Sequence, residues 1–201
     1  DAVFIPGCKT TMADLMALRQ TGMAASLQED AGAGGRVLGI CGGFQMLGKM
    51  VADPEGVEGQ EGRCEGLGLL PMKTIITPQK IARQRQVTSN FPQVGLPVTG
   101  YEIHQGRTRT IESETTTQSL FDDPTLGMVD SGQFVWGTYL HGLFDNGPWR
   151  RAWLNRLRQQ RGLHSLPTGI SNYREQRECL LDSLADQVEV HLDLTPILPN
   201  G

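Results

Sequence analysis

The chain has 201 residues, 38% of them hydrophobic, and a formal net charge of −4, so it can bury one sizeable core. The weakly acidic balance, without a long basic run, argues against a nucleic-acid partner or an anionic membrane surface. No apolar run reaches the ~18 residues of a membrane-spanning helix. Four scattered cysteines fit neither a zinc site nor a disulfide framework, so we expect a cytoplasmic protein without a metal.

The N-terminal part of the chain predicts strands that alternate with helices. Residues 3–5 and 37–40 are short apolar runs that predict buried strands. Between them, the spacing of apolar residues predicts one helix from about residue 12 to 18 and a second over residues 23–28. Because this order brings successive strands side by side, it favours a parallel sheet covered by helices.

The middle of the chain is expected to consist mainly of extended segments and loops. Residues 53–66 are acidic and rich in glycine, and residues 113–119 are rich in threonine, so both predict loops. Strands are expected over residues 73–77, within 78–97, over 98–104 with a continuation at 107–111, and over 134–140.

Two helices are predicted at the C-terminal end. Residues 149–160 predict a helix with apolar Trp149, Trp153, Leu154 and Leu157 and with arginines elsewhere. Residues 171–192 predict a longer helix with a buried apolar side. The positions expected on that buried side are Cys179, Leu180, Leu181, Leu184, Val188 and Leu192.

The strand expected over residues 37–40 runs directly into Cys41, which glycines at 39, 42 and 43 surround. A strand-to-helix turn with a reactive residue at its tip is the arrangement of a nucleophile elbow. Glycine leaves room for the strained backbone of such a turn. The helix N-terminus would favour thiolate over thiol. The pattern therefore predicts that Cys41 is a nucleophile with a depressed pKa.

A free cysteine in a glycine-rich turn can also be a small buried residue without a catalytic role. The wider pattern favours catalysis, because Gly39-x-Cys41-x-Gly43-x-Gln45 resembles the G-x-C-x-G-x-Q signature of class I glutamine amidotransferases.

A cysteine nucleophile needs a base and a site for the oxyanion of the tetrahedral intermediate. His141 follows a predicted strand and precedes a glycine, where an α/β hydrolytic site places its histidine; alone it could equally be a structural residue. The backbone N–H groups of Gly42 and Gly7 are candidates for the oxyanion site, although Pro6-Gly7 could be a simple turn. His164 and His191 are expected to face solvent.

Residues 43–49 (GFQMLGK) fit most of a phosphate-binding G-x-x-x-x-G-K loop. Position 50 is Met, where Mg²⁺ coordination requires a Ser or Thr hydroxyl. The stretch also already forms the turn after Cys41. A phosphate site is therefore not expected here.

Five segments follow one another along the chain: residues 6–15 (PGCKTTMADL), the expected turn at Cys41, residues 65–70 (EGLGLL), 100–108 (GYEIHQGRT) and 137–144 (GTYLHGLF). Together they resemble the glutamine amidotransferase domain of the cobyric acid synthase family, almost from end to end. The resemblance implies an α/β, flavodoxin-like fold of the class I glutamine amidotransferase type, with a mixed, mostly parallel sheet flanked by helices.

The resemblance also implies a reaction. Cys41 as nucleophile and His141 as base would hydrolyse L-glutamine through a glutamyl thioester, with Gly7 and Gly42 framing the oxyanion. The ammonia would pass to a synthetase domain that uses ATP and Mg²⁺ to amidate carboxylates of cobyrinic acid a,c-diamide. Residues 1–201 are then expected to be the glutaminase domain, N-terminally truncated, without cofactor of its own and without the synthetase domain.

Three further residues are implied to lie near bound glutamine, although each could equally be structural. They are Gln45, Glu102 and His104.

The chain departs from the general class at one catalytic position. Many class I enzymes carry a glutamate two residues after the histidine to orient its ring, but this chain has Leu143. The site is therefore a Cys/His dyad, or it uses another acid. Glu102 is the first candidate for that acid and Asp145 the second.

Two alternatives remain open at the sequence level. One is another amidase of the same branch, acting in a,c-diamide formation or on a peptidoglycan precursor; residues 102–104 and 106–108 favour cobyric acid synthesis. The other is a catalytically inactive regulatory domain, against which intact Cys41 and His141 count.

Overall fold

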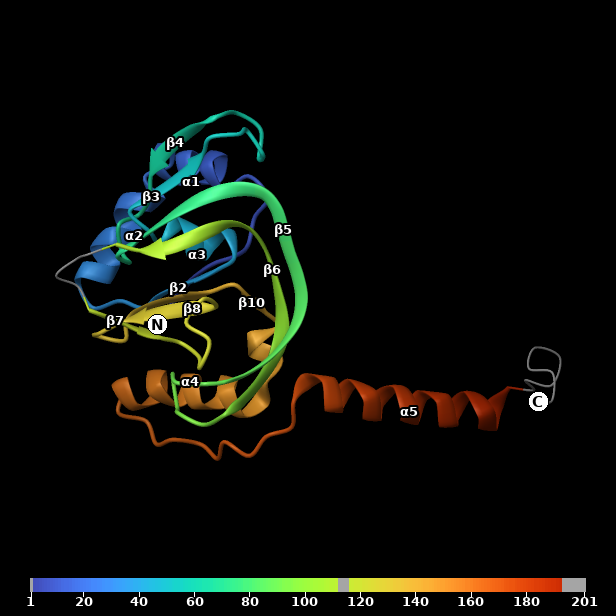
Figure 1. Cartoon of the computed structure of the whole chain (residues 1–201). Helices are drawn as coiled ribbons and strands as arrows, with labels where there is room; N and C mark the ends of the chain where they lie inside the picture. Colours follow the sequence, from blue (N-terminus) through green and yellow to red (C-terminus); the bar gives the residue numbers. More distant parts are fainter. Residues whose placement is uncertain (1, 112–115, 193–201) are drawn as a thin grey trace.

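Two five-stranded sheets form the frame of the protein (Figure 1). The computed structural model describes residues 2–111 and 116–192. The first sheet has the order β1 (Val3–Ile5), β2 (Val37–Ile40), β9 (Val135–Thr138), β8 (Gly127–Asp130) and β7 (Thr117–Ser119). The second has the order β10 (Leu140–His141), β6 (Pro97–Thr110), β5 (Met72–Thr88), β3 (Met50–Asp53) and β4 (Gly62–Glu65). The expected mixed α/β class is confirmed, with the strands divided between two sheets.

Parallel pairing is confined to β1–β2–β9 and to β3–β5. No strand was predicted at β3 or β8, and loops were predicted where β4 and β7 pair; residues 113–115 of the second loop lie outside the described residues. A parallel connection needs a dozen or more residues, and residues 131–134 between β8 and β9 are too few. These strands therefore pair antiparallel and reduce the parallel share of the first sheet.

β5 and β6 are the two longest strands and form an antiparallel ribbon. In Figure 1 this ribbon runs from the region of β3 and β4 down to the region of α4. Residues 78–97, for which one more strand or a hairpin was expected, supply most of β5 and the turn into β6. The register shifts between Ile75 and Lys80, where Gly106 opposite adopts φ +98°, a conformation that favours glycine. This irregularity lies beside the cavity described below.

Helices cover both faces of the first sheet. α1 (Thr11–Gln20), α2 (Met23–Gly32) and α3 (Gly42–Met46) lie on one side, and the short helix η1 (Leu143–Asp145) and α4 (Gly147–Gln160) lie on the other (Figure 1). Successive side chains of a strand point to opposite faces. Val37 and Val135 accordingly join the core under α1–α3, whereas Leu38 and Trp136 join the core under α4.

The helix predicted over residues 149–160 exists as α4, and its two tryptophans are buried, whereas Leu154 is 38% exposed. Trp149 is fully buried and Trp153 is 7% exposed. Both rings pack edge-on against Trp136 of β9, with centroids 5.5 and 6.0 Å apart. Edge-to-face contacts of this kind stabilise aromatic cores beyond simple burial.

The long C-terminal helix exists as α5 (Tyr173–His191), but its predicted buried side is wrong: α5 contains no buried residue. Leu180 is 69% exposed and Leu184 is 59% exposed. Figure 1 shows the reason, because α5 extends away from both sheets instead of packing on them. Within the described ranges, no helix has the length and apolar character required to cross a membrane.

Candidate active site

Cys41 occupies the turn between β2 and α3, as predicted, and is the strained residue of that turn. Its backbone has φ 53° and ψ −112°, a region that residues other than glycine rarely adopt. The turn is held on both sides, because the N–H of Cys41 donates to the carbonyl of Thr138 at 2.9 Å and its carbonyl accepts from Gln45 at 3.0 Å. Strained backbone of this type is often found at functional sites.

The glycines around Cys41 are needed for close packing, not for an unusual φ as the sequence analysis expected. A methyl group at Gly39 would lie 2.5 Å from the carbonyl carbon of Gly43. A methyl group at Gly43 would lie closer to the carbonyl oxygen of Ile5 than real Cβ atoms approach. The backbones of β1, β2 and α3 therefore meet at van der Waals distance and fix where Cys41 lies. We call residues 39–43 the Cys41 turn.

His141 lies beside Cys41, and both side chains face one backbone oxygen. The Cys41 thiol donates to the carbonyl of Ile103 at 3.3 Å, and Nε2 of His141 lies 3.1 Å from the same oxygen. A methyl group on Gly7 would lie 3.3 Å from Cβ of Cys41 and 3.6 Å from Cε1 of His141. The structure thus brings the predicted nucleophile, base and Gly7 together.

A cavity of about 570 Å³ opens over this group. It lies at the carboxyl ends of the parallel strands, where α/β proteins commonly bind ligands. Its lining residues are Gly7, Cys8, Lys9, Cys41, Gln45, Glu58, Lys80, Ile103, His104, Gln105 and His141.

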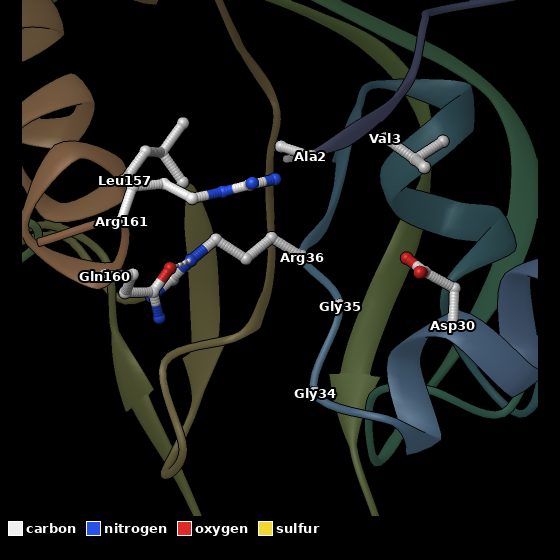
Figure 2. A pocket seen from close by; sticks show the side chains of 9 residues that line it. All are labelled: Ala2, Val3, Asp30, Gly34, Gly35, Arg36, Leu157, Gln160 and Arg161. Carbon is white, nitrogen blue, oxygen red and sulfur yellow. Dashed lines mark hydrogen bonds between the residues drawn. The ribbon is translucent and has the colours of Figure 1, made fainter.

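A second hollow of about 340 Å³ lies at the opposite ends of β1 and β2 (Figure 2). There the guanidinium of Arg36 donates to Oε1 of Gln160 at 2.6 Å and to the carbonyl of Gln133 at 2.6 Å. Figure 2 shows Asp30 on the other side of the hollow from these groups. Arg36 therefore joins α4 to the sheet, and Cys41 is remote from this hollow.

The expectation of a depressed Cys41 pKa is wrong for the free protein. Burial of the thiol raises its pKa, and the negative charge of Glu58 adds to the rise. The N–H of Gly42 and the positive charge of Lys80 act in the opposite direction but do not cancel it. α3 spans only Gly42–Met46, so it supplies a small dipole. Free Cys41 is consequently a thiol at neutral pH.

Glu58 and Lys80 are charged residues of the cavity that the sequence analysis missed. Glu58 accepts from the N–H of Thr11 at 2.6 Å and from its hydroxyl at 3.0 Å. Burial raises the pKa of Glu58, while the hydrogen bonds from Thr11 lower it, and the net shift is upward. Lys80 enters from the irregularity in β5. Neither residue lies in a recognisable sequence motif, because each comes close to Cys41 only when the chain is folded.

Cys8 is a second thiol in the lining of the same cavity. Its sulfur lies 3.8 Å from the hydroxyl of Thr11 and against the position that a Gly42 side chain would fill. Burial, reinforced by a hydrogen bond with Asp14, raises the pKa of Cys8 to about 12. Cys8 is therefore a poorer nucleophile than its place suggests.

Gln45 uses its amide inside the protein. Its Oε1 accepts from the hydroxyl of Thr11 at 3.2 Å, and its Nε2 donates to the carbonyl of Gln105 at 2.8 Å and to the hydroxyl of Tyr139 at 3.2 Å. The residue is 2% exposed. Of the two interpretations left open by the sequence, the structure favours a structural Gln45 that links α1, β6 and Tyr139, the residue between β9 and β10, around the cavity.

Glu102 and His104 form a buried pair on β6. Oε1 of Glu102 lies 3.2 Å from Nε2 of His104, and Oε2 accepts from Nε of Arg83 at 2.8 Å and from Arg85 at 2.9 Å. The His104 ring stacks on Tyr139 with centroids 3.7 Å apart. Of the two, His104 lines the cavity.

These contacts do not place Glu102 on His141, where the missing glutamate of the class would act. In the described part of the chain, the group within hydrogen-bond distance of a His141 ring nitrogen is the Ile103 carbonyl. Asp145 lies near Gly142, and its N–H donates to the Gly142 carbonyl at 3.0 Å. Residues 2–111 and 116–192 contain no cluster of three or more His, Cys, Asp or Glu side chains that could hold a metal.

Comparisons with known proteins point to one family. A family model described as the CobB/CobQ-like glutamine amidotransferase domain matches residues 1–149. The chain is 69% identical over 202 residues to a protein named cobyric acid synthase from Nostoc sp. (strain PCC 7120 / SAG 25.82 / UTEX 2576), which covers 99% of this chain and 41% of that protein. It is 70% identical over 201 residues to the protein of that name from Nostoc punctiforme (strain ATCC 29133 / PCC 73102), which covers 98% and 41%.

The chain therefore spans about 41% of the length of these curated relatives. A solved structure described as a glutamine amidotransferase has a TM-score of 0.50 and 15% sequence identity, over 70% of this chain and 69% of that chain. This likeness shows a shared fold.

Proposed function

The chain belongs to the CobB/CobQ-like glutamine amidotransferase family, and from this membership and the geometry around Cys41 we propose that it hydrolyses L-glutamine to glutamate and ammonia. One observation supports this most strongly: Cys41 Sγ and His141 Nε2 converge on the Ile103 carbonyl, at 3.3 and 3.1 Å, at the mouth of a cavity. A nucleophile and a base brought together in this way suit acyl transfer.

In the proposed reaction, His141 takes the thiol proton of Cys41 as the sulfur attacks the side-chain amide carbon of glutamine. The oxyanion that forms is stabilised by the N–H groups of Gly42 and Gly7. The C–N bond then breaks, His141 returns the proton to the leaving nitrogen, and ammonia departs from a thioester. Water, deprotonated by His141, hydrolyses the thioester and restores the thiol.

The Ile103 carbonyl does the orienting that a glutamate does elsewhere in the class. Because a carbonyl oxygen only accepts, its contact at 3.1 Å places the proton of the neutral ring on Nε2 of His141. Because the Cys41 sulfur and Nε2 share this oxygen, Nε2 takes the thiol proton in the proposed reaction only after its own proton has moved to Nδ1 and the contact with Ile103 is released. A neutral orienter does not stabilise the imidazolium by charge, so it serves the base less strongly than a carboxylate would.

Glu58 and Lys80 are proposed to hold the α-groups of glutamine. The free amino acid carries an ammonium and a carboxylate, and these two side chains bring one charge of each sign to the lining of the cavity. Both charges act on the Cys41 thiol, so both lie within electrostatic reach of the reacting sulfur. One charge of each sign in the same cavity would select a zwitterion and position its side chain for attack.

The ammonia is proposed to serve the synthesis that gives the relatives their name. In that reading the rest of the longer polypeptide uses ATP and Mg²⁺ to activate carboxylates of cobyrinic acid a,c-diamide, and residues 1–201 supply the nitrogen as one domain. The buried, internally bonded α3 that follows Cys41 offers no phosphate site, since Gly42 to Met46 are all buried.

Release of ammonia from glutamine is the direct test, with Cys41→Ser as the variant and Cys8→Ser as its matched control in the same cavity. We expect the turnover of Cys41→Ser to fall about 10³-fold or more, and that of His141→Asn to fall about 10²- to 10⁴-fold. Cys8→Ser should keep most of the turnover. A glutamine analogue with an electrophilic carbon at the amide position should alkylate Cys41. Alkylation of Cys8 instead, or full activity in Cys41→Ser, would contradict the assignment. No ammonia from the unmodified chain, alone or joined to the rest of a relative, would favour an inactive regulatory domain.

A further inference from the structure

α5 carries an apolar stripe that nothing in the described structure covers. At 100° per residue, four aliphatic side chains fall within one arc of the helix: Leu180, Leu181, Leu184 and Val188. Arg177 falls within the same arc. The three leucines are 69%, 49% and 59% exposed. The carboxylates fall on the opposite side: Glu175, Glu178, Asp182, Asp186 and Glu189. This arrangement is that of a helix with one face against a partner and one face in water.

The base of α5 is fixed, so the helix is held in the direction it takes away from the sheets. Oδ1 of Asn172 accepts from the N–H of Gly147 at the start of α4 at 2.9 Å. Glu175 completes a capping box by accepting from the N–H of Asn172 at 3.1 Å. A side chain on Gly147 would collide with the carbonyl of Ser171. α5 thus projects from a tight joint (Figure 1).

The family comparisons indicate where the covering surface comes from. The family model ends at residue 149, before α5 begins. The Nostoc sp. relative nevertheless matches 99% of this chain, and 41% of that relative accounts for the match. α5 is therefore shared with polypeptides that carry a large additional portion.

The size of the stripe decides between a second copy of this chain and that additional portion. A stable complex of separate proteins buries about 800 Å² on each partner, with roughly 20 to 30 residues a side. Four apolar side chains are far fewer. A small contact suffices where the partner is part of the same polypeptide, because the tether supplies a high effective concentration.

We propose that the stripe of α5 docks into an apolar groove on the portion of the longer polypeptide that lies outside the region matched by this chain. The joint at Asn172 and Gly147 then sets the angle at which the two portions meet. The acidic side of α5 remains in water. This inference does not depend on glutaminase activity, since no residue of α5 lines the cavity at Cys41.

Amide hydrogen exchange tests the proposal in two proteins: this 201-residue chain, and a chimera in which it replaces the matching region of the Nostoc sp. relative. We expect the amides of α5 to exchange at least about tenfold more slowly in the chimera, because docking adds protection to a helix that frays when bare. The double variant Leu181→Glu/Leu184→Glu should restore the rate of the isolated chain. Glutamate forms helices well, so the helix itself is retained.

Ser183→Glu is the matched control, since it adds the same side chain away from the stripe and should keep the protection. Equal exchange of α5 in the chain and the chimera would overturn the proposal. So would protection of α5 in the isolated chain at low concentration, which would mean that it folds back on its own body. A concentration-dependent dimer of the isolated chain that the double variant dissolves would assign the stripe to a second copy instead. Retained ammonia release in the double variant would show that the fold survived.

Discussion

The Cys41 turn and α5 each show a recognisable sequence pattern, and they lie at opposite extremes of packing. In the turn, the missing side chain of Gly43 leaves room for a backbone oxygen of β1. In α5 no residue is buried. The turn is patterned because three elements of this chain converge on it. The apolar side of α5 suits contact with a surface that the described residues do not contain. An apolar period therefore predicts that a face will be covered but does not identify what covers it.

The same contrast explains which parts of the site could be predicted. Cys41 was predicted because the turn is local, with its glycines within two residues of the nucleophile. His141 was predicted because it ends a recognisable strand. Glu58 and Lys80 were missed because one arrives on a loop and the other at a register shift of β5, and neither position has a local signature.

The fold was predicted where apolar residues form a run or a period and missed where they do not. β1, β2, β9 and the helices followed from apolar runs and spacing. β4 (GRCE) and β8 (GMVD) are as long as β2 and β9, but neither has a run of more than two apolar residues. The shift of the Cys41 pKa was predicted in the wrong direction, because burial raises this pKa by more than the N–H of Gly42 lowers it. A sequence alone does not give the depth at which a group lies.

The largest expected effect is at the closely packed Cys41 turn. Gly43→Ala should destabilise the protein by several kcal/mol, because the added methyl group meets the carbonyl oxygens of Ile5 and Pro6 and neither backbone can retreat. That is a large share of the about 5–15 kcal/mol that stabilises a domain. Urea unfolding measures it. Gly32→Ala is the control: nothing lies within 4 Å of the added methyl, and alanine favours the helix. Equal midpoints for the two variants would refute the packing role of the turn.

A smaller effect is expected at the buried Glu102. Hydrogen bonds from Arg83 and His104 outweigh burial and lower the pKa of Glu102 below its ordinary value. Its ionised form therefore stabilises the folded state above the ordinary pKa, and this stability is lost as the pH falls through the lowered value. Glu102→Gln should cost about 1–3 kcal/mol at pH 7 and flatten the acid limb of stability against pH.

Turnover of Glu102→Gln separates a structural role from a catalytic one. Because Glu102 contacts His104 and the arginines, we expect its turnover to fall less than that of His141→Asn at a pH where both variants are folded. A loss as large as that of His141→Asn would return Glu102 to the place of the missing class glutamate.

A still smaller effect concerns the two charges at the cavity. Glu58 raises the pKa of the Cys41 thiol and Lys80 lowers it. In a background without the other three cysteines, Glu58→Gln should therefore shift the pH profile of Cys41 alkylation to lower pH, and Lys80→Met should shift it to higher pH. Lys73→Met, an exposed lysine of β5 that does not line the cavity, should leave the profile unchanged. Shifts of the same sign in the two cavity variants would exclude the proposed arrangement of charges.

The smallest expected effect is at the exposed side of α5. Leu184→Ala in the isolated chain should change the free energy of unfolding by no more than about 0.5 kcal/mol, as surface substitutions usually do, because Leu184 is 59% exposed. Leu15→Ala on α1 is the matched change at a side chain with 0% exposure and should cost about 2–5 kcal/mol. Urea unfolding of both variants measures the difference. If Leu184→Ala cost as much as Leu15→Ala, the stripe would already be packed on this chain, and α5 would no longer be free to dock elsewhere.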